Sequence, residues 1–400
     1  MSEDLNDKTG EKPNIVMVLL DGLRADQLFH LPMLSEINKD GILFNDMTTA
    51  SPYTLASLHS IFTGMYGSKN GVDGYYKLDK LKNNCKTLTE YLSERGYYSL
   101  GDQVKLTILP ERGFDKYIAY NDEDNLDYDG PRKNLADRHI GILDDLKYNK
   151  SKDRPFFAFL DCGIMHTVAV KEIFKKYDDF SESYFSNYDD NKKSYIKRLS
   201  IVNDYLTDFW KYFKEELSED TLLILFSDHG MSFGEKMGER AYGVYTYDYT
   251  IKVFSTFIHP LLPKKVTIEE MTETIDIMPT ILDFLNIASD SNFKEMTGTS
   301  LLNSINHKSS FLGSFFSKKK NFTYSETGGL GGPWPSPDKA NVKCIRNNKW
   351  KFIHNLTPNT FELYDLKKDT EEKENVVEYY PKIVASMKDT LLRVNEENER

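Results

Sequence analysis

The stretch NIVMVLLDG, residues 14–22, decides the fold. Its apolar residues form a continuous run without a helical period, and the run ends in an Asp-Gly turn. Such a run is typical of a strand that is buried on both faces, as in a parallel sheet covered by helices. Two further runs repeat this form: PFFAFLDCG, residues 155–163, and TLLILFSDHG, residues 221–230. The sequence therefore predicts three parallel strands, each followed by polar residues and a glycine.

Helical patterns lie between and after these runs. CKTLTEYLSERG, residues 85–96, has apolar residues at helical spacing and stops at glycine. SYIKRLSIVNDYLTDFWKYFKEEL, residues 194–217, predicts a long amphipathic helix that leads into the third strand. TETIDIMPTILDFLNI, residues 272–287, predicts another helix with an internal proline. This alternation favours a doubly wound α/β sheet.

The pattern changes after about residue 292. TGGLGGPWPSP, residues 327–337, is a Gly/Pro loop. The segments KCIRNNKWKFIHN and FELYDLKKD predict short antiparallel strands, and EYYPKIVASMKDTLLRVNEE predicts a closing helix. We expect a catalytic α/β domain over residues 12–291 and a small C-terminal α+β subdomain over residues 292–400.

Composition limits the classes of partner. With 40% hydrophobic residues in 400, a large core is expected. The net charge of −11 argues against nucleic acid, whose phosphates need basic faces, but a bound metal would still allow a small anionic substrate. We see no signal peptide, and the apolar run at residues 15–20 is too short to span a bilayer. We therefore expect a cytoplasmic protein without a transmembrane segment, whose oligomeric state stays open.

Side chains suited to chemistry follow all three predicted strands: Asp21, Asp161 with His166, and Asp228 with His229. A single strand-end Asp is often only a cap or turn residue, but three at one sheet edge, where ligands collect, favour a site. In a turn beyond the strand, Asp228 and His229 can converge on one ion, because Gly230 lets the backbone bend. Carboxylate plus imidazole suits Zn²⁺ or Mn²⁺ better than Ca²⁺.

Six motifs, in this order, resemble the sulfatase branch of the alkaline phosphatase superfamily: NIVMVLLDGLRAD, LPMLSEINKDGILFNDMTTASPYTLASLHSIFTGMYGSKNGV, TLTEYLSERGYYSLGD, LLILFSDHGMSFGEK, TIDIMPTILDFLNI and FELYDLKKDTEEKENV. The resemblance covers residues 14–377. It implies a sandwich with a central, mostly parallel sheet between helices, a small C-terminal subdomain, and a metal at the carboxyl edge of the sheet.

The loop SPYTLASLHSIFTG, residues 51–64, departs from the sulfatase pattern. Counting back from its Thr-Gly end puts the family's Cys or Ser nucleophile on Thr54 and its Arg on Leu58. The family's residue must be oxidised to the aldehyde formylglycine. Oxidation of threonine would give a ketone, because its carbinol carbon bears a methyl group. The formylglycine mechanism is therefore not expected here.

Threonine at this position is similar to the phosphodiesterase and phosphoglycerol-transferase members of the superfamily, in which a metal-held Thr alkoxide attacks phosphorus. The resemblance assigns Asp21, Thr54, Asp228 and His229 to the metal set. Sulfatases usually carry a second Asp where this chain has Gly22, and losing an oxygen ligand moves the site toward Mn²⁺ or Zn²⁺. We expect one divalent ion, with Ca²⁺ and Mg²⁺ less favoured.

The hydroxyl of Thr54 also has a purely structural explanation. A free Thr hydroxyl is a poor nucleophile at neutral pH, and a bound metal would lower its pKa and align it. Alternatively, Ser51, Thr54 and Ser57 simply cap a helix that starts near Leu55. Both can hold, because a helix N-terminus is itself an anion site.

Four further side chains are candidates for the substrate site. His166 lies where relatives place a substrate-binding or proton-donating His, and the alternative is a solvent-facing loop residue. Lys105 lies within one residue of the family's anion-binding Lys, and Lys236 shortly follows His229, although surface lysines are the alternative for both. His59 follows the vacant Arg position, where it would contact substrate or face the helical core.

The sequence thus predicts a metal-dependent hydrolase or transferase for phospho-esters, with attack by Thr54 and a phospho-threonine intermediate. One alternative is a sulfatase that cleaves sulfate esters without formylglycine. Another is a non-catalytic relative that binds an anion or a glycan. The expected partner is a small anionic ester, glycan- or lipid-linked, and neither its alcohol nor the acceptor, water or an alcohol, follows from the sequence.

Overall fold

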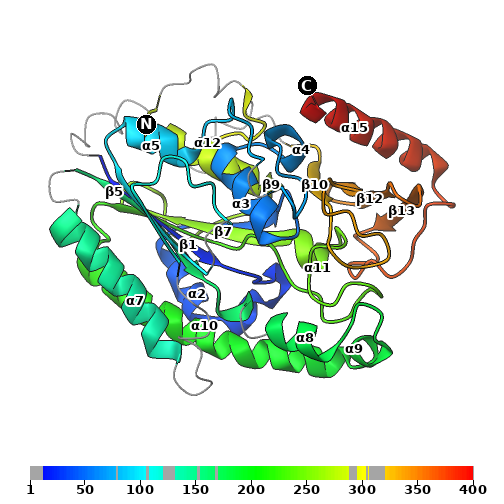
Figure 1. Ribbon diagram of the computed structural model, residues 1–400, viewed down its shortest axis with the longest axis horizontal. Helices are drawn as coiled ribbons and strands as arrows, with labels where there is room; N and C mark the ends of the chain where they lie inside the picture. The colour runs from blue at the N-terminus through cyan, green and yellow to red at the C-terminus, as the bar shows by residue number, and fades with distance from the viewer. Residues whose placement is uncertain are drawn as a thin grey trace.

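The computed structural model describes residues 12–77, 80–104, 108–119, 131–150, 154–166, 170–287, 295–302, 305 and 320–399. At the centre of this part of the chain lies a sheet in the order β4-β3-β5-β1-β6-β7-β2-β8, with β9 paired to β2 (Figure 1). Its strands are β1 (Asn14–Leu20), β2 (Ile42–Thr48), β3 (Tyr98–Gln103), β4 (Lys116–Ala119), β5 (Phe156–Cys162), β6 (Thr221–Phe226), β7 (Lys252–Ile258), β8 (Val266–Ile268) and β9 (Thr272–Glu273).

The three strands expected from the apolar runs are β5, β1 and β6, and they are direct neighbours. β1 pairs in parallel with both, so that Ile15 faces Phe157 on one side and Leu222 on the other. Every residue of β5 and β6 is buried. The prediction of parallel strands buried on both faces is confirmed, and their carboxyl ends meet at one edge. β7, by contrast, runs antiparallel to β6 and β2.

Helices cover both faces of this sheet (Figure 1). One layer contains α2 (Pro32–Ile37), α7 (Pro131–Asp145) and α10 (Tyr188–Glu216), and the other contains α3 (Thr54–Thr63), α5 (Leu88–Glu94) and α12 (Ile277–Phe284). Alternate residues of β1 pack against the two helix layers, because successive strand side chains point to opposite faces. Val16 and Val18 belong to the core under α10, and Ile15 and Met17 belong to the core under α3.

Apart from one C-terminal helix, the remaining helices of the described chain are short: η1 (Ala25–His30), η2 (Asn38–Asp40), α4 (Gly67–Asn70), η3 (Leu146–Lys150), α8 (Lys171–Lys176), α9 (Glu182–Ser186), α11 (Asp248–Ile251) and η5 (Thr274–Asp276). No helix among the described residues combines the length and the apolar character needed to cross a membrane. The expected cytoplasmic location stays a prediction.

The helix expected over residues 272–287 starts later than its apolar pattern suggests. Thr272 and Glu273 instead form β9 beside β2, and the 3-10 turn η5 follows. The side chains of Glu273 and Asp276 each accept a hydrogen bond from the other's backbone, which ends the strand and starts the turn. Pro279 then lies in the first turn of α12, where its missing N–H costs no helical hydrogen bond.

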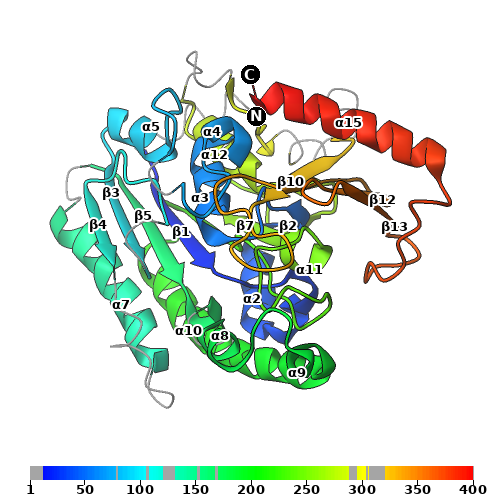
Figure 2. The same ribbon diagram turned by 45° about the vertical axis from the view of Figure 1, so that its right-hand side comes forward.

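A second, antiparallel sheet occupies the C-terminal region (Figure 2), which confirms the predicted antiparallel strands. It contains β10 (Thr323–Thr327), β11 (Val342–Arg346), β12 (Trp350–Asn355) and β13 (Thr360–Asp365), and α15 (Pro381–Glu399) packs against it. The backbone of Glu326 donates to the carbonyl of Ala50, which joins this sheet to the segment before α3. The predicted boundary at residues 291 and 292 lies outside the described residues and remains a prediction.

Candidate functional site

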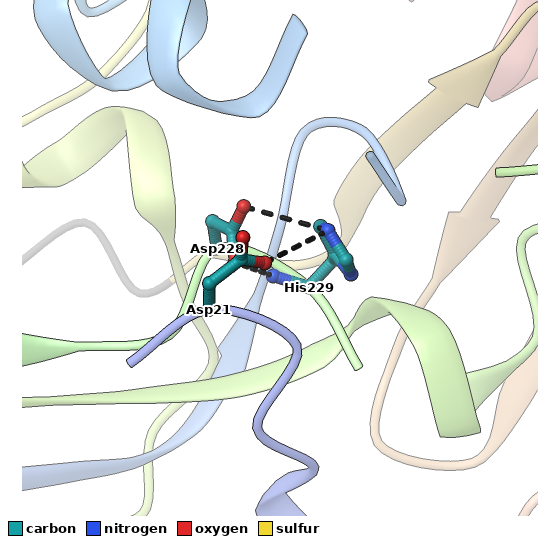
Figure 3. A group of neighbouring side chains, drawn as sticks. All are labelled: Asp21, Asp228 and His229. Carbon is teal, nitrogen blue, oxygen red and sulfur yellow. Dashed lines mark hydrogen bonds and ion pairs between the residues drawn. The ribbon is translucent and has the colours of Figure 1, made fainter. Parts of the chain in front are cut away.

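Three buried side chains converge at the carboxyl edge of the main sheet. Asp21 follows β1, and Asp228 and His229 follow the adjacent strand β6. One ligand atom from each lies within 4.8 Å of the others. The Nε2 atom of His229 is 3.4 Å from Asp21 Oδ1 and 3.5 Å from Asp228 Oδ2. Figure 3 shows the two carboxylates facing the imidazole ring. The structure thus brings together the three predicted metal ligands that end the first and third strands.

The ring of His229 is oriented to offer a lone pair to this cluster. Its Nδ1 atom lies 2.8 Å from the carbonyl oxygen of Gly230. Because a carbonyl only accepts hydrogen bonds, Nδ1 carries the proton and donates it there. In the neutral ring, Nε2 is then the unprotonated atom, and it faces the carboxylates. A backbone carbonyl that fixes the tautomer in this way is the usual support of a metal-binding histidine.

The carboxylate of Asp228 shows why a cation fits here. Its Oδ1 accepts hydrogen bonds from the backbone N–H of His229 at 2.9 Å and of Gly22 at 3.4 Å. Its Oδ2 is buried and accepts no hydrogen bond from the part of the chain that the structure describes. A buried carboxylate oxygen without such a partner is costly. A divalent cation between Oδ2, Asp21 and His229 would remove that cost, so the donor set fits a metal ion.

Glycine replaces the family's second Asp for a conformational reason as well. Gly22 has a φ of +71°, a region that residues with a Cβ rarely adopt. This turn brings its N–H toward Asp228 Oδ1. Glycine at this position therefore permits the turn that aims the backbone N–H at Asp228, a predicted metal ligand.

Thr54 lies at the cluster and does not cap a helix. α3 begins at Thr54, its N-cap residue is Tyr53, and no side chain caps it. The Oγ1 atom of Thr54 is instead 3.1 Å from His229 Nε2. The hydroxyl of Ser57 donates to the carbonyl of Asp228 at 3.0 Å and lies 3.0 Å from the hydroxyl of Thr49. The capping alternative is therefore wrong, because these hydroxyls contact the site and its supporting loop.

His166 reaches the site through a residue that the sequence analysis missed. Its Nε2 atom is 2.5 Å from the hydroxyl of Tyr242, and the Tyr242 ring packs against His229 with centroids 4.3 Å apart. Burial, the Tyr75 hydroxyl and the carboxylates of Asp21 and Asp228 raise the pKa of Tyr242 well above its ordinary value. The phenol therefore keeps its proton at neutral pH. No motif or spacing in the sequence singled out Tyr242.

Lys236, a predicted substrate contact, is held by groups outside this cluster. Lys236 donates to the carbonyl of Glu372 at 2.5 Å and lies over the ring of Tyr247. It lines a cavity of about 900 Å³ whose walls include Arg24 and Arg346 but not the Asp21, Asp228 and His229 group. Burial lowers the pKa of Lys236. Lys105 lies outside the described residues, so its role remains a prediction.

His59 is placed within the packing of α3. It is 2% exposed, and its Nδ1 donates to the carbonyl of Leu55 at 2.8 Å. Burial lowers the pKa of this imidazole from 6.5 to about 4, and a minor contribution comes from repulsion by Arg112. Of the two positions expected for His59, facing substrate or facing the core, the structure shows the second.

The buried neutral state of His59 predicts a loss of stability in acid. Since the unfolded chain binds this proton near pH 6.5 and the folded chain only near pH 4, the contribution is present above pH 6.5 and disappears as the pH falls to 4. The loss is about 3 kcal/mol. His59→Gln should flatten the pH dependence of the free energy of unfolding, measured with urea at pH 7 and pH 4.5. His30→Gln, at a less buried histidine, is the control, and an equal flattening there would contradict the prediction.

Family models match both parts of this chain. The sulfatase model matches residues 13–287, and the model described as N-sulphoglucosamine sulphohydrolase, C-terminal, matches residues 244–397. The Ulvan-active sulfatase of Formosa agariphila is 24% identical over an alignment of 368 positions, which covers 86% of this chain and 66% of that protein. Arylsulfatase K of Mus musculus is 26% identical over 176 residues, 44% of this chain and 30% of that protein. The chain thus spans less than two thirds of these relatives.

Solved structures share the fold at low sequence identity. A protein in complex with its substrate D-glucosamine-2-N,6-O-disulfate superposes with a TM-score of 0.76 at 16% identity, over 97% of this chain and 98% of that one. The phosphonate monoester hydrolase of Agrobacterium radiobacter gives a TM-score of 0.75 at 16% identity, over 97% and 96%. These likenesses confirm the predicted sandwich fold. Together with the family model, which covers more than half of the sequence, they confirm the resemblance: this chain belongs to the sulfatase family.

Proposed function

We propose that this protein is a metal-dependent hydrolase or transferase of phospho-esters that uses Thr54 as its nucleophile. The observation that carries the proposal is the 3.1 Å separation between Thr54 Oγ1 and His229 Nε2, inside a group that also contains Asp21 and Asp228. A hydroxyl, an imidazole lone pair and two carboxylates in such a group form a donor set for one divalent cation with a nucleophile beside it.

The metal set that we propose is Asp21, Thr54, Asp228 and His229, in which Thr54 is both a ligand and the nucleophile. We favour Mn²⁺ or Zn²⁺ over Ca²⁺ and Mg²⁺, because an imidazole stands among the oxygen ligands. When bound, the ion lowers the pKa of a neighbouring hydroxyl and neutralises charge that builds up on an ester oxygen.

Side chains and backbone groups of the protein carry out the remaining steps of the proposed reaction. The Thr54 hydroxyl releases its proton to solvent as its oxygen attacks phosphorus, the bond to the leaving alcohol breaks, and Thr54 is left carrying the phosphoryl group with its remaining substituent. Water or a second alcohol then attacks the same phosphorus and frees the hydroxyl. His166 is the candidate that donates a proton to the leaving oxygen. The first hydrogen bond of α3 runs from Ser57 N–H to the carbonyl of Tyr53, so the earlier N–H groups lie outside the helical pattern, and we propose that they bind the anion.

A sulfate ester is the second candidate substrate, and the comparisons favour it. The relatives named above are sulfatases, and one structural neighbour binds a sulfated glucosamine. The side chain at residue 54 favours a phospho-ester substrate, because threonine cannot become the aldehyde whose hydrate expels sulfate. A sulfated threonine would need attack by water at sulfur. In either case the partner that we propose is a small anionic ester, glycan- or lipid-linked.

Chromogenic esters separate these functions. The purified chain, loaded in turn with Mn²⁺, Zn²⁺ and Ca²⁺, is given bis(4-nitrophenyl) phosphate and 4-nitrophenyl sulfate, and released nitrophenolate is measured. We expect kcat/KM for the phosphodiester to exceed that for the sulfate by about tenfold or more, a difference of about 1.4 kcal/mol. A higher value for the sulfate would replace the proposal by the second candidate. Stoichiometric metal without turnover of either ester would indicate a non-catalytic, anion- or glycan-binding relative.

A further inference from the structure

We propose that Tyr242 is a positioning residue of this same site, whose ring holds His229 and whose hydroxyl holds His166. The inference rests on the proposed function and adds to it a side chain that contacts neither the reacting ester nor the ion. It assigns separate tasks to the two parts of one tyrosine, and these tasks can be removed one at a time.

Two contacts place Tyr242 between the imidazoles. Its ring lies against His229 with centroids 4.3 Å apart and an interplanar angle of 35°. Its hydroxyl lies 2.5 Å from His166 Nε2. His229 follows β6, whereas His166 follows β5, so a single side chain spans the carboxyl ends of two strands on either side of β1. The stacking face limits rotation of the His229 ring, whose other restraint is the hydrogen bond from Nδ1 to Gly230.

The loop that carries Tyr242 is held by a buried carboxylate. Glu239 Oε1 accepts hydrogen bonds from the backbone N–H of Val244 and Tyr245, each at 2.9 Å. Glu239 Oε2 accepts a hydrogen bond from the hydroxyl of Tyr249 at 2.6 Å. Glu239 is fully buried, so these bonds are shielded from water. These hydrogen bonds join residue 239 to residues 244 and 245, and Tyr242 lies between them in the sequence.

The residue after Tyr242 fits only as glycine. Gly243 has a φ of +89°, and a Cβ added to it would lie 3.1 Å from the hydroxyl oxygen of Tyr75. Its carbonyl accepts a hydrogen bond from the hydroxyl of Thr327 at 2.6 Å. The carbonyl of Ala241, before Tyr242, accepts a hydrogen bond from the backbone N–H of Ser232 at 2.5 Å. The backbone on both sides of Tyr242 is thus anchored, which a positioning residue requires, because an anchored backbone leaves its side chain few orientations.

The ring alone would suffice for packing. Tyr242 is partly buried and packs against the core beneath the sheet, and a phenylalanine would fill that role equally well. The hydroxyl is needed only if the orientation of His166 matters. Because an outer partner of a functional imidazole fixes its tautomer and direction, losing the hydroxyl should affect proton donation and leave metal binding intact. Losing the ring should affect both.

Two variants separate the two tasks. Tyr242→Phe keeps the stacked ring and removes the bond to His166. We expect kcat for diphenyl phosphate, whose leaving phenol needs a proton, to fall about tenfold or more, and kcat for bis(4-nitrophenyl) phosphate to change by less than about threefold. Tyr242→Leu removes the ring as well, and its Mn²⁺ affinity in titration calorimetry should fall about tenfold or more, whereas Tyr242→Phe should match the wild type.

The matched control is Tyr245→Phe. It removes a tyrosine hydroxyl from the same loop, where Tyr245 donates to the carbonyl of Met237 at 3.0 Å, and it should match the wild type in both measurements. In the double variant with His166→Ala, Tyr242→Phe should add no further loss on diphenyl phosphate.

The proposal is overturned if Tyr242→Phe slows both esters equally or neither, or if Tyr242→Leu keeps full Mn²⁺ affinity. The affinity measurement needs no turnover, so it tests the proposed role of the Tyr242 ring independently of the reaction. Full activity of a Thr54→Ala variant would remove the proposed function while leaving the contacts of Tyr242 to be judged by metal binding.

Discussion

Replacing Thr54 with alanine is expected to lower kcat on bis(4-nitrophenyl) phosphate by a factor on the order of 10⁴ or more, because the substitution removes the atom that forms the covalent intermediate. Thr54→Ser is the matched control: it keeps a hydroxyl on the same Cβ and should retain activity within about tenfold. Turnover measured with the metal-loaded protein, by release of nitrophenolate, compares the three forms.

The structure predicts that this loss will not come from unfolding. No side chain caps α3, so alanine at its first position removes no capping hydrogen bond. The contact between Ser57 and the carbonyl of Asp228, which ties α3 to the loop after β6, is untouched. Thr54→Ala should therefore unfold at the wild-type urea concentration and bind metal with similar stoichiometry.

Mass spectrometry gives a second, independent readout. A chain quenched during turnover of bis(4-nitrophenyl) phosphate should carry a 4-nitrophenyl phosphoryl group on the peptide that contains Thr54, and Thr54→Ala should carry none. The same phosphoryl group found on Ser51 or Ser57 instead, or undiminished turnover by the alanine variant, would remove the nucleophile assignment.

Much of this site was predictable because it follows from strand order. Continuous apolar runs mark strands buried on both faces, and β1, β5 and β6 are such runs and lie side by side. Residues just beyond parallel neighbours must then meet, which places Asp21 beside Asp228 and His229. The inference needs only the local pattern and the rule that parallel strands end at one edge.

Other features depend on contacts that no local pattern encodes. Ser57 meets the carbonyl of Asp228 across 171 residues, and Tyr242 meets His166 across 76. Serine and tyrosine are both common in these segments, and no periodic pattern in the sequence marks either contact. The predicted start of α12 was wrong for a related reason. The residues around Glu273 have the apolar spacing of a helix, but Glu273 pairs with β2 and is therefore part of a strand. Here tertiary pairing overrides local propensity.

The second large effect is expected from Asp228→Asn, which should weaken Mn²⁺ or Zn²⁺ binding by more than about 100-fold, beyond the range for losing an outer partner of a metal site. Asp228 Oδ1 is already occupied by the N–H groups of His229 and Gly22, so Oδ2 is the oxygen left to face the ion. The amide lowers the negative charge of the cluster and can present hydrogen atoms to the cation. Titration calorimetry of the chelator-treated protein measures the change directly.

Binding of the same ion should raise the stability of the folded chain, and this effect tests the set of metal ligands without any substrate. A ligand that binds only the folded chain at about 100 times its dissociation constant adds roughly 2.7 kcal/mol to the free energy of unfolding. Metal should therefore raise the Tm of the wild type and of Asp161→Asn, the matched control, because Asp161 is also a buried strand-end carboxylate and holds the N–H of Val104 at 3.1 Å. Metal should leave the Tm of Asp228→Asn nearly unchanged. If Asp228→Asn gained as much as the wild type, the cation would bind elsewhere, and the 3.1 Å contact between Thr54 and His229 would lose its chemical meaning.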